Sequence, residues 1–440
     1  MEHADILIKN GMILTMDNND TIYDDGVVAI KDDLIIYIGE KKEKEFSAKK
    51  IIDAREKLVM PGLINCHTHA PMSLFKGIAD DIPLMEWLTK YIFPVEKNMD
   101  EEFVYNGAML ACVEMIMSGT TTFCDMYLFE EQVALAGKDT GMRCLVGEVL
   151  YDFDSPNYGP IDEGFRYTEK LIKRWRHDTL VSIAVEPHAT FTCSPELLKK
   201  AHEIALEYNV PMVIHLSETQ NEVEETKKNY GRRPAEHLNS VGILYPGLIA
   251  VHCVHLENYE IELLKDHGVR VVNVPESNLK LGSGIAPVPE MMEAGITVGL
   301  GTDGSASNNN LDMFSEMDTS AKIQKVRCMD TTVMDAKTVV RMATIDGAKT
   351  LGLDHITGSI EKGKKADIII LDLNKAHLTP IYNPLSHIVY AAGGGDVTHS
   401  IINGRIVMEE RKLINIDLDD IIERANREAK RVREWTGIKY

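Results

Sequence analysis

Residues of the kinds that bind metals stand after short apolar runs at four places in this chain. His67 and His69 come after LVMPGLIN, His215 after PMVI, His252 after LIAV, and Asp303 after ITVGLGT. Short apolar runs are typical of buried strands, and polar residues at the ends of parallel strands gather at one rim of a barrel. Several imidazoles and one carboxylate on such a rim indicate a catalytic divalent metal ion, and zinc is the simplest choice.

The middle of the chain, residues 61–354, alternates strand-like runs with helical stretches. Helices are expected, for example, over 100–119 and 194–209, and the second begins with an N-cap serine and a first-turn proline. Such alternation predicts parallel βα units and, with eight strands, a TIM-like (β/α)8 barrel in the α/β class. The expected strands lie near 61–66, 120–125, 143–150, 180–187, 211–216, 248–253, 269–274 and 296–302.

The two ends of the chain have a different texture. Residues 1–60 are short β-type runs separated by turn signals, and 355–440 return to β-branched runs with an Asn-Gly turn. We expect both ends to join into one small β-sandwich, with the barrel over 61–354 between its halves. A final helix with an acidic start and a basic end, DLDDIIERANREAKRVREW, closes the second segment.

The composition argues against several classes of protein. The 440 residues carry a formal net charge of −21, which disfavours nucleic-acid binding because that requires a basic surface. No apolar run approaches the roughly 18 residues that cross a bilayer, and the first residues lack the apolar core of a secretory signal. The seven cysteines are dispersed without C-x-x-C spacing, which favours the cytoplasm over a disulfide-forming compartment.

His67 and His69 are two residues apart, so an extended strand would direct both imidazoles to one face. The alternative is an H-x-H that falls in a turn by chance, but Pro-Gly before the pair and Ala-Pro after it indicate a strand-to-loop junction. His215 alone would be read as a hydrogen-bonded polar tip. Glu218, three residues later, favours chemistry because its carboxylate could reach an activated water or the substrate.

His252 and His255 are alternatives within VHCVHL. We select His252, which stands at the strand end, and expect His255 to be structural. Asp303 could cap a helix, but as a ligand it completes the set, binding metal through one oxygen and accepting a proton with the other. Ser305 and Asn308 to Asn310 could line the pocket or cap the next helix, and capping is favoured for the asparagines.

A lysine is missing from the predicted fourth strand, LVSIAVEPHAT. Two-metal enzymes on barrels of this type often bridge their ions with a modified lysine on that strand. We therefore expect a single metal ion, which leaves His188 at the end of this strand free to contact a substrate.

Taken in order, these motifs resemble those of the amidohydrolase superfamily, in its mononuclear deaminase branch. PGLINCHTHAPMSLFKGIADDIPLMEWL contains the H-x-H and the loop after it, and VIHLSET, VHCVHL and GTDGSASNNNLDMF match the later motifs. The resemblance covers essentially the whole chain. The nearest group is similar to the 5-methylthioadenosine/S-adenosylhomocysteine deaminases and their 5′-deoxyadenosine deaminase relatives.

The resemblance implies a role for each candidate residue. Glu218 would contact the purine and move protons, and His252 would hold the metal-bound water. Glu96, in FPVEKNM, would hold the ribose hydroxyls, and His188 would contact the sugar region. Asp303 would both contact the substrate and accept a proton. The zinc ligands would be His67, His69, His215 and Asp303.

The reaction implied is hydrolytic deamination, in which a metal-bound hydroxide attacks C6 of a 5′-modified adenosine and yields the inosine analogue and ammonia. Relatives that accept S-adenosylhomocysteine commonly have an arginine on or after the third strand. Here Arg143 stands at the start of that strand, and Glu148 and Asp152 occupy the later region. We therefore favour 5′-deoxyadenosine and 5′-methylthioadenosine over S-adenosylhomocysteine and adenosine.

Other functions remain as alternatives. Guanine or cytosine deamination, or s-triazine hydrolysis, would use the same metal ligands with a different pocket. A non-catalytic scaffold would have lost ligands that this chain keeps. The expected partner is a small nucleoside, with no nucleic acid and no membrane. A homo-oligomer is compatible with the family, although the sequence indicates no interface.

Overall fold

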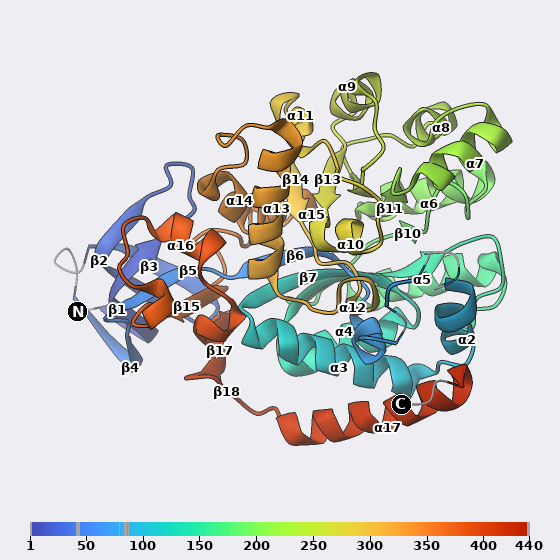
Figure 1. Ribbon diagram of the computed structural model, residues 1–440. Helices are drawn as coiled ribbons and strands as arrows, with labels where there is room; N and C mark the ends of the chain where they lie inside the picture. Colours follow the sequence, from blue (N-terminus) through green and yellow to red (C-terminus); the bar gives the residue numbers. More distant parts are fainter. Residues whose placement is uncertain (1, 41–44, 79, 83–85, 87, 438–440) are drawn as a thin grey trace.

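The computed structural model describes residues 2–40, 45–78, 80–82, 86 and 88–437, which form a barrel beside a second sheet (Figure 1). Residues 79, 83–85 and 87, in the loop after the H-x-H motif, lie outside the described part, as do the last three residues of the predicted chain-end unit.

Eight strand positions make up the barrel, and neighbouring strands are parallel. Hydrogen bonds from the backbone NH of Val213 to Val185 O and of His215 to His188 O, both 3.0 Å, join the two halves of the ring. The NH of Asp303 donates to the carbonyl of His67 (2.9 Å) and closes it. In order, the strands are β6 (Leu63–Thr68), β7 (Thr120–Tyr127), β8 (Arg143–Leu150), the pair β9 (Val181–Ile183) and β10 (Glu186–Pro187), β11 (Met212–Leu216), β12 (Leu248–His252), β13 (Arg270–Asn273) and β14 (Val298–Leu300).

The TIM-like barrel expected from the sequence is confirmed, and each predicted strand overlaps one strand position. The predicted fourth strand is interrupted between β9 and β10. The first strand continues to Thr68, so His67 lies within β6 and His69 follows its end. Every residue of β6, β7 and β8 is buried, as expected for parallel strands that are covered on both faces.

Helices surround the barrel strands (Figure 1). The helix expected over 194–209 is α6, and the hydroxyl of Ser194 caps it by accepting from the NH of Leu197 (3.3 Å). No helix in the described ranges is long and apolar enough to cross a membrane. The helices are α3 (Glu101–Met117), α4 (Glu130–Thr140), α5 (Ile161–Trp175), α6 (Pro195–Tyr208), α7 (Gln220–Tyr230), α8 (Pro234–Val241), α9 (Asn258–Asp266), α10 (Pro275–Lys280), α11 (Val288–Glu293), α12 (Ser305–Asn308), α13 (Met313–Cys328), α14 (Ala336–Met342) and α15 (Ile345–Leu351); the segment after β6 adds η1 (Ala70–Phe75), η2 (Leu88–Ile92) and α2 (Phe93–Glu96).

The two chain ends meet in one nine-stranded sheet, as the sequence predicts. β5 pairs antiparallel with β15, where Met60 lies opposite Ile369. Aliphatic side chains from strands of both ends share one core, as in a sandwich. The strands are β1 (Glu2–Leu14), β2 (Ile22–Lys31), β3 (Leu34–Glu40), β4 (Phe46–Asp53), β5 (Lys57–Pro61), β15 (Ile368–Asp372), β16 (Val397–Ile402), β17 (Arg405–Glu409) and β18 (Lys412–Leu413); η3 (Ala376–Leu378), α16 (Pro384–Tyr390) and η4 (Gly394–Asp396) connect β15 to β16.

The C-terminal helix α17 (Leu418–Thr436) runs beneath α3 (Figure 1). The sequence groups it with the chain-end unit, but its contacts are with barrel helices. The rings of Phe103 and Trp435 lie 5.4 Å apart, and the amide of Asn106 donates to the buried carboxylate of Glu428 (2.9 Å). The helix therefore ties the end of the chain to the barrel.

Arg143 stands at the start of β8 and links the barrel to the chain-end sheet. Its Nε donates to Asp367 Oδ2 (2.8 Å) and its Nη1 donates to the carbonyl of Thr179 (2.8 Å). Both members of the Arg143–Asp367 pair are buried. Since the candidate site lies at the opposite, C-terminal ends of the strands, this arginine is not available to bind a substrate.

We expect Asp367→Asn to lower the free energy of unfolding by about 3–5 kcal/mol, because it leaves a buried guanidinium without its counter-charge. Urea denaturation measures the loss. The double variant Arg143→Met/Asp367→Leu should lose less, since no unpaired charge remains. A matched surface control, Glu163→Gln, breaks the exposed pair with Arg166 and should have little effect. A single variant as stable as the parent would contradict this expectation.

Candidate active site

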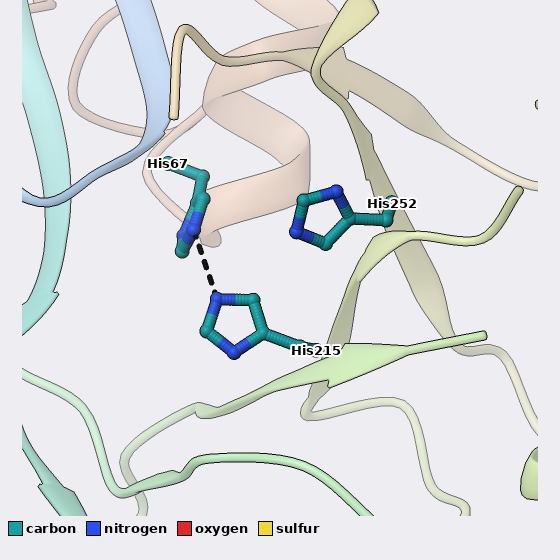
Figure 2. A group of neighbouring side chains, drawn as sticks. All are labelled: His67, His215 and His252. Carbon is teal, nitrogen blue, oxygen red and sulfur yellow. Dashed lines mark hydrogen bonds between the residues drawn. The ribbon is translucent and has the colours of Figure 1, made fainter. Parts of the chain in front are cut away.

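The five strand-end residues selected from the sequence meet at the C-terminal rim of the barrel. Figure 2 shows the imidazoles of His67, His215 and His252, from β6, β11 and β12, pointing toward one another. Nε2 of His67 lies 3.2 Å from Nε2 of His215. Oδ1 of Asp303 lies 3.2 Å from Nε2 of His69 and 3.6 Å from Nε2 of His67. Two sets of ligand atoms therefore converge: those of His67, His215 and His252, and those of His67, His69 and Asp303.

Three of the imidazoles are oriented through their Nδ1 atoms. His69 bonds the carbonyl of Met126, His215 bonds the carbonyl of His188 (2.9 Å), and His252 bonds the amide oxygen of Asn278 (2.9 Å). Because carbonyl and amide oxygens only accept, each Nδ1 carries a hydrogen, and the Nε2 of a neutral ring is left with a lone pair. This arrangement is usual for histidines that bind metal through Nε2.

The carboxylate of Asp303 is fixed by small donors. Ser277 and Ser307 donate to its Oδ2 (2.6 and 3.0 Å), and the NH of Gly304 donates to its Oδ1 (2.8 Å). Asp303 has a φ of +61° and His252 a φ of +73°. Left-handed backbone at residues other than glycine costs free energy and concentrates at functional sites. The strand ends therefore hold these side chains at an energetic cost.

The donor set fits a divalent cation. Burial lowers the pKa of His67 and of His215 well below the ordinary value, so both imidazoles are neutral, as ligands need to be. Burial alone would raise the pKa of Asp303, but its hydrogen bond and charge interaction with His69 hold that pKa well below the ordinary value. For His69 burial opposes protonation, yet Asp303 raises its pKa to about 9. Neutral imidazoles at His67 and His215, beside a carboxylate that attracts positive charge at His69, are the kinds of ligand that zinc prefers.

Glu218 lies beside this cluster, just after β11. Its Oε2 is 3.8 Å from Nε2 of His252, and its Oε1 accepts from the hydroxyl of Ser283 (3.4 Å). Its backbone is held by Glu222, whose carboxylate accepts from the NH of Glu218 (2.7 Å) and of Ser217 (3.0 Å). Ser217 has a φ of +52°. Glu222 therefore fixes the turn that presents Glu218.

The sequence carries a local signal at Glu222. Thr219-x-x-Glu222 is a capping-box pattern, and Thr219 does accept from the NH of Glu222 (3.2 Å). The carboxylate, however, reaches past the N-cap to the two preceding NH groups. Asn278, Ser277 and Ser307 carried no such local signal, because they meet the site only through the fold.

The two remaining substrate-binding candidates flank the cluster. The ring of His188, at the end of β10, lies 5.0 Å from the ring of His215, and burial lowers its pKa to about 4. Glu96, at the end of α2, accepts from the hydroxyl of Tyr127 (2.9 Å), whose ring lies 5.9 Å from that of His69. Burial raises the pKa of Glu96. His188 therefore lies next to the candidate ligand His215, and Glu96 is linked to the surroundings of His69 through Tyr127.

The residues expected to be structural bond within the protein. His255 Nε2 bonds the carbonyl of Ser283 (2.8 Å). Asn308 donates to the carbonyl of Thr302 (3.0 Å) and to Glu316 (2.7 Å). The contact of His255 agrees with the expected structural role. The next helix, α13, is capped by Asp312, so the prediction that Asn308 caps it is wrong.

Known proteins resemble this chain over its full length. The sequence model of the amidohydrolase family matches residues 58–407. A protein of Syntrophobacter fumaroxidans named 5-methylthioadenosine/S-adenosylhomocysteine deaminase is 54% identical over 98% of this chain and 99% of its own length. A protein of Syntrophus aciditrophicus named 5-methylthioadenosine/S-adenosylhomocysteine deaminase 1 is 52% identical over 99% of both chains.

Solved structures share the fold. An adenosine deaminase from Xanthomonas campestris with bound zinc superimposes with a TM-score of 0.97 at 38% identity, covering 98% of this chain and 99% of its own. Atrazine chlorohydrolase from Arthrobacter aurescens, with zinc, gives a TM-score of 0.91 at 23% identity over 96% of this chain and 100% of its own. The second likeness shows the fold alone.

We expect Glu222→Gln to flatten the dependence of stability on pH. Burial raises the pKa of Glu222 from 4.5 to about 7, so the native state binds a proton that the unfolded chain releases between these values. This group therefore contributes stability below pH 4.5 that is lost as pH rises through about 7, by about 3 kcal/mol. Urea denaturation at pH 5, 6, 7 and 8 measures the difference between variant and parent. Glu224→Gln, exposed on the same helix, is the control and should follow the parent.

Proposed function

Since this chain belongs to the amidohydrolase family, we propose that it removes the 6-amino group of 5′-modified adenosines by hydrolysis, giving the inosine analogue and ammonia. The preferred substrates are 5′-deoxyadenosine and 5′-methylthioadenosine, with S-adenosylhomocysteine and adenosine as further candidates. The observation that carries the proposal is the 54% identity, over nearly the full chain, to a protein named for this activity. The geometry of the strand ends supports it, because it supplies both the ligands and the acid–base groups.

The proposed ligands of one divalent ion, most simply zinc, are His67, His69, His215 and Asp303. The Nε2 and Oδ1 atoms described above face one another, and His252 Nε2 is the remaining nitrogen of the cluster. When bound, such an ion supplies Lewis acidity and lowers the pKa of a water molecule to about 7.

His252 and Asp303 are the proposed partners of the attacking water. Asn278 holds Nδ1 of His252 as a donor, so Nε2 is left to hold the water. Asp303 would accept a proton at Oδ2, where Ser277 and Ser307 now donate. A hydroxyl can rotate from donor to acceptor at little cost, so these serines can follow the charge of the carboxyl group.

Glu218 is the proposed proton donor to the ring nitrogen beside C6. Protonation there makes the carbon electrophilic. The proton that Asp303 takes from the water would then pass to the departing amino group, and Glu218 would regain a proton from the new hydroxyl at C6 as the carbonyl forms. Its Oε2 is 3.8 Å from His252 Nε2, so one small ring atom can lie near both groups. Glu222 would keep Glu218 in this position through the two NH bonds described above.

Glu96 and His188 are the proposed contacts of the ribose. Glu96 is held by Tyr127, whose ring lies beside His69. Thr192 Oγ1 lies 2.9 Å from Nδ1 of His188, whose ring lies beside His215. A carboxylate that accepts from two ribose hydroxyls would favour nucleosides over free bases and triazines.

The 5′ end of the substrate is proposed to be uncharged. Residues 147–160 contain no lysine or arginine. Arg143 is committed to Asp367, and Asp152 accepts from the hydroxyl of Ser194 (3.1 Å). A carboxylate on the 5′ substituent would therefore find no cation in this part of the chain.

Steady-state kinetics across four nucleosides test the proposal. We expect kcat/KM to be highest for 5′-deoxyadenosine and 5′-methylthioadenosine, lower for adenosine, and lowest for S-adenosylhomocysteine, whose tail lacks a cationic partner. The ultraviolet shift that accompanies conversion of adenine to hypoxanthine reports turnover. Guanine, cytosine and an s-triazine are the comparison substrates, and faster turnover of any of them would sink the proposal.

We expect Glu218→Gln to reduce kcat by about 10²–10⁴-fold, because it removes the proposed general acid. The variant should keep its fold and its metal, since Glu218 is not among the proposed ligands. Elemental analysis of the purified protein checks the metal. Asp303→Ala, by contrast, should lose the metal. Glu224→Gln should match the parent in both kcat and metal content. A Glu218→Gln enzyme with near-normal kcat would remove this residue from the mechanism.

A further inference from the structure

We propose that the buried carboxyl pair Asp125 and Glu130 is a positioning device for the H-x-H segment, holding His67 and His69 in the geometry that binds the metal. The proposal rests on the metal site of the proposed function. It concerns the affinity of that site, which can be measured without any substrate.

The end of β7 contacts every residue between Thr68 and Ala70. Oδ1 of Asp125 accepts from the hydroxyl of Thr68 (2.7 Å) and from the NH of Ala70 (2.5 Å). The carbonyl of the next residue, Met126, accepts from Nδ1 of His69. One short stretch of β7 therefore fixes the position of the segment and the orientation of the second imidazole.

These contacts replace part of the regular strand pairing. The register between β6 and β7 shifts between Asn65 and Thr68, where Thr68 pairs with Asp125. A strand with an irregular register loses ladder hydrogen bonds at that point. The side chain of Asp125 supplies bonds where the backbone ladder is irregular, which is the part of β6 that contains His67.

Glu130 gives Asp125 a partner of its own. Both side chains are fully buried, and none of the ion pairs in the described part of the chain joins either of them to a lysine or arginine. Two carboxyl groups in contact in a dry interior cannot both be ionised. Burial, followed by the charge of Asp125, raises the pKa of Glu130 well above the ordinary value. Oδ2 of Asp125 and both carboxyl oxygens of Glu130 are buried and have no other hydrogen-bond partner among the described residues, so a neutral Glu130 can donate to Asp125.

Glu186 belongs to the same buried acidic cluster but is not hydrogen-bonded to the H-x-H segment in the described part of the chain, so burial in the cluster is not sufficient for the positioning role. It is also fully buried near Asp125, but its hydrogen-bond partner is the thiol of Cys124, and it has no bond to residues 68–70. Glu186 is therefore the matched control for a purely structural effect.

The test is the dissociation constant of zinc, measured by competition with a chelator on metal-stripped, full-length protein. We expect Asp125→Ala to weaken zinc by about 10–100-fold, the usual cost of losing a residue that orients a metal ligand. Asp125→Asn keeps an acceptor for Thr68 and Ala70 and should recover most of that loss. Glu130→Gln keeps a neutral donor and should stay near the parent. Glu186→Ala should lower the thermal midpoint and leave zinc affinity unchanged.

Two further measurements keep the outcome decisive. Thermal unfolding of each metal-free variant separates loss of fold from loss of affinity. Should Asp125→Ala not fold, Thr68→Val removes only the hydroxyl bond and should weaken zinc to an intermediate degree. The proposal is overturned if Asp125→Asn binds zinc as weakly as Asp125→Ala, if Glu186→Ala weakens it equally, or if the parent does not bind zinc. If the parent binds zinc and the variants weaken it as expected, but the parent does not deaminate the nucleosides, the positioning role stands and only the proposed function is overturned.

Discussion

The hydrogen bond from the NH of Asp303 to the carbonyl of His67 closes the barrel, and the candidate site depends on it. It joins the first strand to the segment after the last, so that a carboxylate and an imidazole distant in sequence come within 3.6 Å. Without a cation, burying imidazole lone pairs so close to a negatively charged carboxylate is unfavourable. A cation bound between these groups makes the same arrangement favourable. Ring closure and binding of the proposed cation would therefore be coupled, and a change that distorts one would weaken the other.

A second group of residues surrounds the proposed ligands. Their hydrogen bonds orient the side chains of the site, and they are not themselves proposed to bind the metal. Asn278, Ser277 and Met126 bond the sides of His252, Asp303 and His69, respectively, that face away from the cluster. Glu222 and Asp125 do the same for backbone turns. Left-handed backbone at Ser217, His252 and Asp303 costs about 1–3 kcal/mol each. These bonds offset that cost, and a site held this way reorganises little during reaction.

The barrel and the meeting of its strand-end residues could be predicted from the sequence. In a parallel barrel, polar residues that follow short apolar strands all lie at the C-terminal rim. It could not predict Asn278 or Asp125 as supports, since their contacts are set by tertiary packing. Glu222 did carry a local pattern, which also describes an ordinary helix cap. The docking of α17 on α3 was not predicted either, because an amphipathic helix can cover any apolar surface of suitable size.

The position of Arg143, at the start of the third barrel strand, bears on the choice of substrate. Arg143 points to the chain-end sheet, where pairing with Asp367 offsets the cost of burying both charges. Beyond it, Glu148 accepts from the NH of Glu130 (3.0 Å) and from Asn157 (2.8 Å), and burial raises its pKa to about 7. An incoming carboxylate would raise that pKa further and would lose its own hydration without gaining a partner. Under the proposed function, a methyl or methylthio group would meet neither penalty. Stability at one end of the barrel and the proposed selectivity at the other would then both follow from where a single arginine is placed.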